Sequence, residues 1–334
     1  MSIPSSSWTS VLQDIISSHN ERHRIATALD ITATTLSRWA NSEYKPQRFD
    51  LIRLVQAVQP QHRQELVEAL EEEYPDVHTW LLDDTAATGS IEADFFAQVL
   101  NVRTTTTESL LFWRISDMVL KKALDELDRN QLGMSIKLIQ CMPPSSDGRI
   151  CSLRESVGKG TAPWTADLEH EVIFLGLESM SGYTVEMRHV INHDDLSKNT
   201  TFPAYRGKFE VSAAAHPICL EGRIAGCLLA ASTQVGHFSQ QRLALLATFS
   251  NLIALAFNKN EFYSPELLDM RVMPPPDKQR PIVATFRERV WEKFRPVTHG
   301  QERPSSKEVE LLAWQEIESE LLKLPVDAST SYRP

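Results

Sequence analysis

The sequence lacks any long apolar run. Nowhere do 18 or more apolar residues follow one another, and a helix needs about that length to span a membrane. The start of the chain, MSIPSSSWTS, has neither a basic stretch nor an apolar core, so it does not resemble a secretory signal. We therefore expect a cytoplasmic protein with no part in a membrane.

Signatures of the common enzyme sites are also missing. The chain has no GxxxxGK[ST] phosphate loop, no GxSxG nucleophile elbow and no HExxH zinc motif. Its four cysteines, Cys141, Cys151, Cys219 and Cys227, form no CxxC pair. In a cytoplasmic chain such scattered cysteines are expected to be reduced and buried. We expect no enzymatic activity.

Histidine and aspartate occur in the middle of the chain, but not with the spacing of a metal site. These residues are His170, His189, His193, Asp194, Asp195 and His216. They do not place two ligands on adjacent turns of one helix, and they do not follow a zinc-finger pattern. We expect no metal, and the sequence identifies no cofactor.

The net charge of −10 is unevenly distributed along the 334 residues. Residues 1–64 carry 7 Lys or Arg against 5 Asp or Glu, whereas residues 65–94 carry 10 acidic residues and no Lys or Arg. A mildly basic beginning is therefore followed by an acidic connector. The length indicates about two or three domains.

Residues 24–58 have the pattern of short helices separated by a tight turn. Small Ala26 would let a second helix cross closely. Thr32 is placed to cap that second helix, in which Leu36 and Trp39, three residues apart, would face the core. The opposite face is left small and polar with one long cation, which suits a helix in the DNA major groove.

With the trailing pattern SRWANSEYKP and FDLIRLVQAV, the stretch from Trp8 to Gln59 resembles the helix-turn-helix of the phage-repressor and Cro family. The resemblance implies DNA contacts by Thr32, Ala33, Thr34, Ser37, Arg38, Lys45 and Arg48. That family usually has Gly where Asp30 and Ser42 stand here, so strain is expected at both positions. The alternative is a helical bundle that contacts proteins only.

Two strongly helical segments, 91–101 and 108–128, follow the acidic connector. The second has a broad apolar stripe that includes Leu111 and Ile115. One side of it can cover a sheet, and the other can meet a second subunit or pack within the same chain. A weakly basic reader of one DNA half-site needs a second copy, so we expect a homodimer.

From Met134 the pattern changes to strands. MSIKLIQCM and RICSLRES predict one hairpin, and SAAAHPICL and IAGCLLAAS predict another, before a long amphipathic helix. The residues GYTVEMRHVINHDDLSKNTTF, HPICLEGRIAGCLLAAS and HFSQQRLALLATFSNLIALAF, in this order, resemble a GAF domain over residues 109–259. The resemblance implies an antiparallel sheet of about five or six strands. It also implies that the first and last helices cover one face and that a ligand pocket lies under loops on the other.

A mixed aromatic and methionine lining is predicted for that pocket: Trp164, Phe174, Met180, Tyr183, Met187, His189 and Phe202. The alternative for each is ordinary core. One branch of GAF-like proteins reduces free methionine sulfoxide with a cysteine after a loop like VGKG, but here Thr161, Ala162 and Pro163 follow that loop. No cysteine between Cys151 and Cys219 could hold a bilin covalently, whereas non-covalent haem or tetrapyrrole stays open.

The last part begins with the breaker cluster MPPPDKQRP and continues with two helices, ATFRERVWEKF and SSKEVELLAWQEIESELLKL. Ser305 and Glu308 have the spacing of a capping box. One face of the second helix should carry Leu311, Trp314, Ile317, Leu321 and Leu324.

The sequence therefore predicts an α+β multidomain protein. Its expected parts are a helix-turn-helix DNA-binding domain (1–74), an acidic linker with a connecting helix (75–108), a GAF-like sensor with an antiparallel sheet flanked by helices (109–260) and a helical C-terminal extension (261–334). We expect a dimeric transcription regulator whose partners are double-stranded DNA, a second copy and a small-molecule effector or redox signal. The alternatives are a ligand-free GAF-like scaffold for dimerisation and a thiol-dependent reductase.

Overall fold

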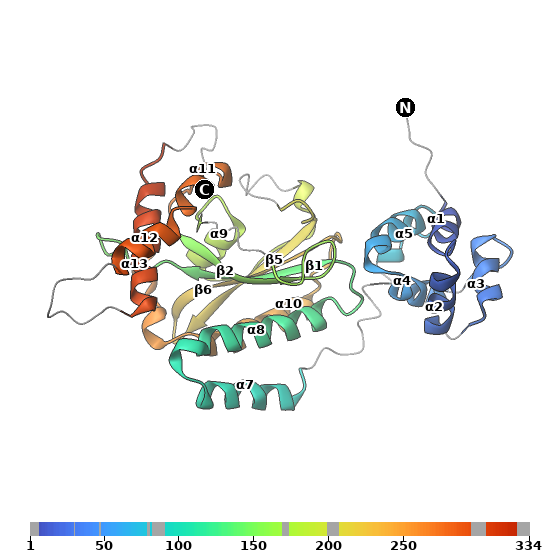
Figure 1. Ribbon diagram of the computed structural model, residues 1–334, viewed down its shortest axis with the longest axis horizontal. Helices are drawn as coiled ribbons and strands as arrows, with labels where there is room; N and C mark the ends of the chain where they lie inside the picture. Colours follow the sequence, from blue (N-terminus) through green and yellow to red (C-terminus); the bar gives the residue numbers. More distant parts are fainter. Residues whose placement is uncertain are drawn as a thin grey trace.

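The computed structural model describes residues 7–29, 31–46, 48–78, 81, 91–168, 174–198, 207–294 and 305–325, without the side chains of residues 48, 49 and 56. Within these ranges the chain forms an N-terminal helical bundle, a central antiparallel sheet flanked by helices, and a C-terminal group of helices (Figure 1). The α+β class is thus confirmed. No helix in this described part is both long and apolar enough to cross a membrane.

The N-terminal bundle consists of α1 (Trp8–Ile15), α2 (His19–Leu29), α3 (Ala33–Ala40), α4 (Arg48–Ala57) and α5 (Pro60–Glu73). These helices enclose an apolar core in which Leu36 and Trp39 are 0% and 2% exposed, as their spacing predicts. Helix α2 begins five residues before the predicted Arg24, at His19. Its first turn is polar and faces solvent, so it gives no apolar periodicity to find. That this bundle is a helix-turn-helix stays a prediction.

The central sheet has the strand order β3-β2-β1-β6-β5-β4, and all neighbouring strands are antiparallel. The strands are β1 (Met134–Cys141), β2 (Leu153–Gly160), β3 (Phe174–Leu175), β4 (Ile191–His193), β5 (Ser212–Leu220) and β6 (Arg223–Ser232). Both predicted hairpins are present. The predicted second strand began at Arg149, but β2 begins at Leu153 because Ile150 and Cys151 bond instead to the segment after α10.

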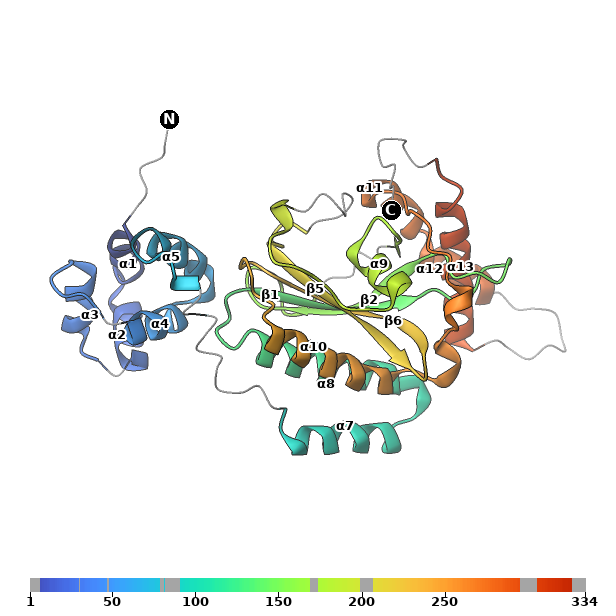
Figure 2. The ribbon, with the colours of Figure 1, turned by 180° about the vertical axis from the view of Figure 1, so that it is seen from behind.

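One face of the sheet is covered by α8 (Glu108–Leu127) and α10 (Gln240–Ile253), which lie side by side in Figures 1 and 2. Helix α9 (Met180–Met187) lies on the opposite face. This is the arrangement of the first and last helices that the GAF-like resemblance implies.

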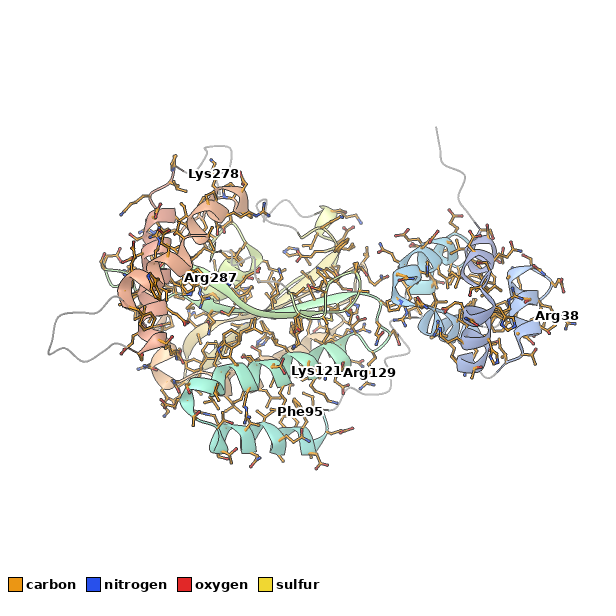
Figure 3. The ribbon with its side chains drawn as sticks, in the orientation of Figure 1. Arg38, Phe95, Lys121, Arg129, Lys278 and Arg287 are labelled. Carbon is orange, nitrogen blue, oxygen red and sulfur yellow. The ribbon has the colours of Figure 1, made fainter. Side chains whose placement is uncertain are left out.

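The connecting helix α7 (Ala93–Thr105) packs along the outer side of α8. Its Phe95 and Val99 are buried, and Figure 3 shows Phe95 between the two helices. Part of the broad stripe on α8 is therefore covered within the chain. Leu100, Leu110 and Trp113 stay outside this contact, each more than half exposed at 54%, 53% and 54%.

After α10 the chain passes through short 3-10 turns (Ala254–Ala256, Lys259–Glu261 and Pro265–Leu267) and then forms α11 (Pro276–Val283), α12 (Phe286–Phe294) and α13 (Ser306–Leu321). The breaker cluster was predicted to be non-helical, but it contains most of α11. Pro276 lies in the first turn, where a missing N–H removes no helical hydrogen bond, whereas Pro281 lies inside the helix and removes one. The predicted capping box is present: Glu308 accepts from the Ser305 N–H at 2.8 Å.

These C-terminal helices share a core with the sheet. Trp314, Ile317 and Leu321 of α13 pack with Phe174, whereas Leu311, predicted on the same face, is 40% exposed. Gln279 of α11 is 2% exposed and bonds to the backbone of edge strand β3. Its amide oxygen accepts from the Phe174 N–H at 2.8 Å, and its amide nitrogen donates to the Phe174 carbonyl at 2.8 Å. The side chain thus pairs with β3 as a further strand would.

Candidate functional site

The outer face of α3 carries most of the residues assigned to DNA contact. Thr32, Ala33, Thr34 and Arg38 are exposed there, and Ser37 is half-buried with its hydroxyl donating to the Ala33 carbonyl at 3.0 Å. Figure 3 shows Arg38 on the side of the bundle away from the sheet. Lys45 is exposed in the following loop. Arg48 is the first residue of α4, and its side chain lies outside the described atoms.

Both ends of α3 are fixed by local hydrogen bonds. At the start, the Thr32 hydroxyl accepts from the Thr35 N–H at 3.1 Å, which confirms the predicted cap. At the end, the Ser42 N–H donates to the Trp39 carbonyl and the Glu43 N–H donates to the Arg38 carbonyl, which together form a Schellman motif. Ser42 has a φ of 60°, the left-handed conformation that favours glycine, as expected. The second expected site of strain, Asp30, lies outside the described residues.

Each of the two described cations has an acidic neighbour within the bundle. Arg38 lies 3.9 Å from Glu43, with both side chains more than half exposed. Lys45 lies 2.6 Å from Glu73, which also accepts from the Trp8 indole at 2.6 Å. The hydrogen bond from Lys45 lowers the pKa of Glu73, so this carboxylate stays charged near neutral pH. A phosphate would have to compete with both acids.

The sheet face under α9 is lined by small side chains. Met180 of α9 packs on Ala213, Ala215 and Ala231, and the Ser179 hydroxyl caps the helix by accepting from the Gly182 N–H at 3.0 Å.

This same face also carries charge. Lys137 lies between Ile136 and Leu138 on β1, and both of these pack in the core under α8 and α10. Because successive side chains of a strand point to opposite faces, the Lys137 side chain is on the α9 side. There its ammonium lies 3.1 Å from the Glu155 carboxylate, and each side chain is only 15% exposed. Thr184 lies one turn after Met180, is fully buried, and its hydroxyl has no hydrogen-bond partner among the described atoms.

The predicted pocket residues are distributed over several places. Phe174 is in the core shared with α13, where its ring centroid lies 6.0 Å from that of Trp314. Trp164 packs edge-on against Phe209 with 5.8 Å between ring centroids. Neither ring touches the Met180 cluster.

The remaining predicted pocket residues lie on or after α9. Tyr183 is half-buried on that helix, whereas Met187 is 44% exposed and His189 is exposed. Phe202 lies outside the described residues. The structure therefore does not bring the described members of this set into one site.

Sequence reasoning missed Lys137, Glu155 and Thr184. Alternating charges in a strand indicate a solvent-facing side, and only the pairing of β1 with β2 shows that these two meet at a covered surface. A threonine in an eight-residue helix gives no signal of burial.

Most of the cysteine thiols are buried. All four cysteines are free; Cys141, Cys151 and Cys227 are buried, and only Cys219 is exposed. Burial raises the pKa of Cys227 to about 12 and that of Cys141 well above its usual value. These two thiols stay protonated at neutral pH and are weak nucleophiles. No group of three or more His, Cys, Asp or Glu residues within the described ranges could hold a metal.

No protein-family model matches this chain, and no curated protein matches it either. The solved structures described next each match about half of its length. The GAF domain of an Acinetobacter phosphoenolpyruvate-protein phosphotransferase has 16% identity and a TM-score of 0.37, covering 51% of this chain and 93% of that one. The corresponding domain from Coxiella burnetii has 17% identity and a TM-score of 0.31, with coverages of 44% and 90%. A type II free methionine-R-sulfoxide reductase from Thermoplasma acidophilum has 16% identity and a TM-score of 0.34, with coverages of 46% and 98%.

Proposed function

We propose that this chain is a DNA-binding transcription regulator, active as a homodimer, whose GAF-like part senses a small molecule. The observation that carries the DNA-binding half is α3. This short helix is capped at both ends, anchored by Leu36 and Trp39, and presents exposed Thr34 and Arg38 on its outer face. A rigid, small and polar helix face with one arginine can enter the major groove, where arginine contacts guanine in a bidentate fork.

The test begins with selection of preferred sequences from a random pool of duplex DNA, followed by fluorescence anisotropy with the selected and a scrambled duplex. Arg38→Ala should lose about 1–3 kcal/mol on the selected duplex and much less on the scrambled one. Lys45→Ala should weaken binding to both about equally, as expected for a phosphate contact. Arg287→Ala, an exposed arginine on α12 (Figure 3), is the matched control and should change neither.

Failure to select any sequence, or equal affinity of all four proteins for both duplexes, would contradict DNA reading by α3. The alternative role of the bundle, contact with proteins only, would then be favoured.

The dimer is supported by the exposed apolar side chains at the outer surface of α7 and α8. Leu100, Leu110 and Trp113 offer a hydrophobic surface next to a helix pair that already packs together. Light scattering should give twice the monomer mass for the wild type, and Trp113→Lys should shift it toward the monomer. A wild type that stays monomeric at micromolar concentration, with and without DNA, would contradict the dimer.

The sensing half is supported by the buried, unpartnered hydroxyl of Thr184 beside the small residues of the sheet. A buried hydroxyl without a partner is costly, and a polar ligand group beneath α9 would satisfy it. We propose that the ligand is a small molecule that carries a hydrogen-bonding group and an apolar body. We assign no catalysis, since the Cys141 and Cys227 thiols stay protonated and Thr161 stands where the reductase branch has a cysteine.

Incubation with cell extract, re-purification and mass spectrometry would identify a bound molecule. Its addition should raise the melting temperature of the wild type and raise that of Thr184→Val by less. The alternative, a ligand-free scaffold, is favoured by the separation of Phe174 and Trp164 from the Met180 cluster. The scaffold would be supported if no compound is found on the re-purified protein, or if none of the compounds found changes its melting temperature.

A further inference from the structure

The turn between α8 and β1, residues 128–133, is held tightly by the sensor. Asp128 is 3% exposed, and its carboxylate accepts from the Leu132 N–H at 2.8 Å, the Gly133 N–H at 3.3 Å and the Thr161 hydroxyl at 2.5 Å. Thr161 directly follows β2. The carboxylate therefore ties the turn to the end of a second strand.

The end of β6 holds the same turn from the other side. The Thr233 hydroxyl donates to the Leu132 carbonyl at 2.7 Å, and the Thr233 N–H donates to the Gly133 carbonyl at 3.1 Å. Gly133 has a φ of +108°, and a Cβ there would lie 2.8 Å from the Thr233 methyl carbon and 2.9 Å from the Ala162 carbonyl oxygen. The turn is thus a rigid extension of the ends of three strands.

The outer side of this turn is gripped by the N-terminal bundle. Arg63 of α5 is 8% exposed and donates to the carbonyls of Asn130 at 2.9 Å and Gln131 at 2.8 Å, as well as to the Val58 carbonyl at 2.8 Å. The Asn130 amide donates to the Leu81 carbonyl at 2.9 Å. Leu132 is 6% exposed and packs in the core of the bundle.

A buried guanidinium makes this contact sensitive to small displacements. Burial lowers the pKa of Arg63, and the Asp128 carboxylate opposes that effect. A charged group taken out of water needs its hydrogen-bond partners, and a displaced turn would remove the Asn130 and Gln131 carbonyls from Arg63 while its bond to Val58 stayed in place. Such a contact is either complete or broken, which is the property a switch requires.

We propose that residues 128–133 form the joint that sets the orientation of the N-terminal bundle relative to the sheet, and that changes at the end of β2 reach α5 through it. The chain of contacts runs from the Trp164 N–H to the Thr161 carbonyl at 2.9 Å, from Thr161 to Asp128, and through the turn to Arg63. The use of this route for regulation rests on the proposed function. The role of the turn in fixing the orientation of the bundle is independent of that function.

Spin labels on the exposed native Cys219 and on a cysteine introduced at exposed Ser10 would report the distance between sensor and bundle. Pulsed dipolar spectroscopy of the labelled full chain should give one narrow distance distribution. Arg63→Ala should broaden it at least twofold. Arg129→Ala, on the same turn but paired with Glu126 outside the joint, should leave it unchanged.

Transmission is tested with Thr161→Val, which removes the bond to Asp128 and the acceptor of the Met134 N–H without touching the bundle. It should broaden the distribution, whereas the control Thr165→Val, whose exposed hydroxyl donates to the Asp167 carbonyl, should not. A distribution equally narrow in Arg63→Ala and wild type would overturn the joint, and an unchanged Thr161→Val would overturn transmission.

Circular dichroism would verify that Arg63→Ala keeps its helices. If it loses them, Asn130→Ala, which removes one bond to Leu81, tests the joint instead. An unchanged distance distribution in Asn130→Ala would then overturn the joint. No DNA enters these measurements, so a failed joint and a failed DNA-binding assignment are distinguishable.

Discussion

Replacing Glu318 by glutamine is expected to stabilise the protein above neutral pH. Glu318 lies on α13, is 2% exposed, and accepts a hydrogen bond from the Ser152 hydroxyl at 2.6 Å. Burial raises the pKa of this carboxyl to about 7 from an ordinary value of 4.5, and the nearby charge of Asp147 acts in the same direction. Glutamine keeps the acceptor oxygen and removes the ionisation.

The sign of the pH dependence follows from the direction of that pKa change. The folded protein holds the proton more tightly than the unfolded chain, so its stabilising effect is complete below about pH 4.5 and is lost as the pH rises through about 7. The difference between the two pKa values corresponds to about 3 kcal/mol as an upper limit. The wild type should therefore lose up to this amount relative to Glu318→Gln between about pH 5 and about pH 8.

Urea unfolding at a series of pH values measures the free energy of unfolding for both proteins. Comparison at each pH removes the contributions of the other buried carboxyls, Asp128 and Glu178, whose pKa values burial raises to about 6 and about 7. Glu316→Gln, an exposed neighbour on the same helix paired with Lys293, is the control and should follow the wild type. A difference between wild type and Glu318→Gln that does not change with pH would refute the reasoning.

Three further changes test the bundle and the sheet edge. Ser42→Gly should raise the free energy of unfolding by about 1 kcal/mol in thermal denaturation, because φ is 60° there and the side chain is exposed. The control Asn41→Gly, at a φ of −85°, should show no gain in the same assay. Glu43→Gln should tighten binding to duplex DNA at low salt by releasing Arg38, and anisotropy titrations that give wild-type affinity at every salt concentration would contradict this. Gln279→Leu should lower the free energy of unfolding by about 2–4 kcal/mol, because it leaves the N–H and carbonyl of Phe174 buried and unpaired; a loss below about 1 kcal/mol in urea unfolding would show that water replaces the amide.

Local signals in the sequence were sufficient for much of the fold. Capping residues act within one turn, so Thr32 and the pair Ser305 and Glu308 could be assigned from spacing alone. The two hairpins were equally readable, since each has short strands on either side of a turn. The missed features depend on distant parts of the chain. Strand β2 begins later than predicted because the backbone of Ile150 and Cys151 is hydrogen-bonded to residues 267–271. No local sequence pattern predicts these bonds.

The candidate sites divide in the same way. The exposed face of α3 follows from helical periodicity, so its residues could be placed before the structure was known. The residues of the face under α9 depend on which strands pair. Some of the aromatic residues predicted for the pocket from composition pack in other cores, as Phe174 does. Arg63 reads as one more polar residue on an amphipathic helix, and its contact with residues 130 and 131 crosses the whole acidic connector.

The pairing of Gln279 with β3 has a consequence for any attempt to isolate the domain that contains the sheet. An uncovered edge strand presents free N–H and carbonyl groups to other molecules and invites strand-to-strand aggregation. A fragment that ends near residue 260 lacks Gln279, together with Trp314 and Ile317, which cover Phe174 from the side. Such a fragment is expected to self-associate along β3, and its oligomers would be mistaken for the proposed homodimer. The C-terminal helices therefore belong in every fragment of the sheet domain used to measure assembly.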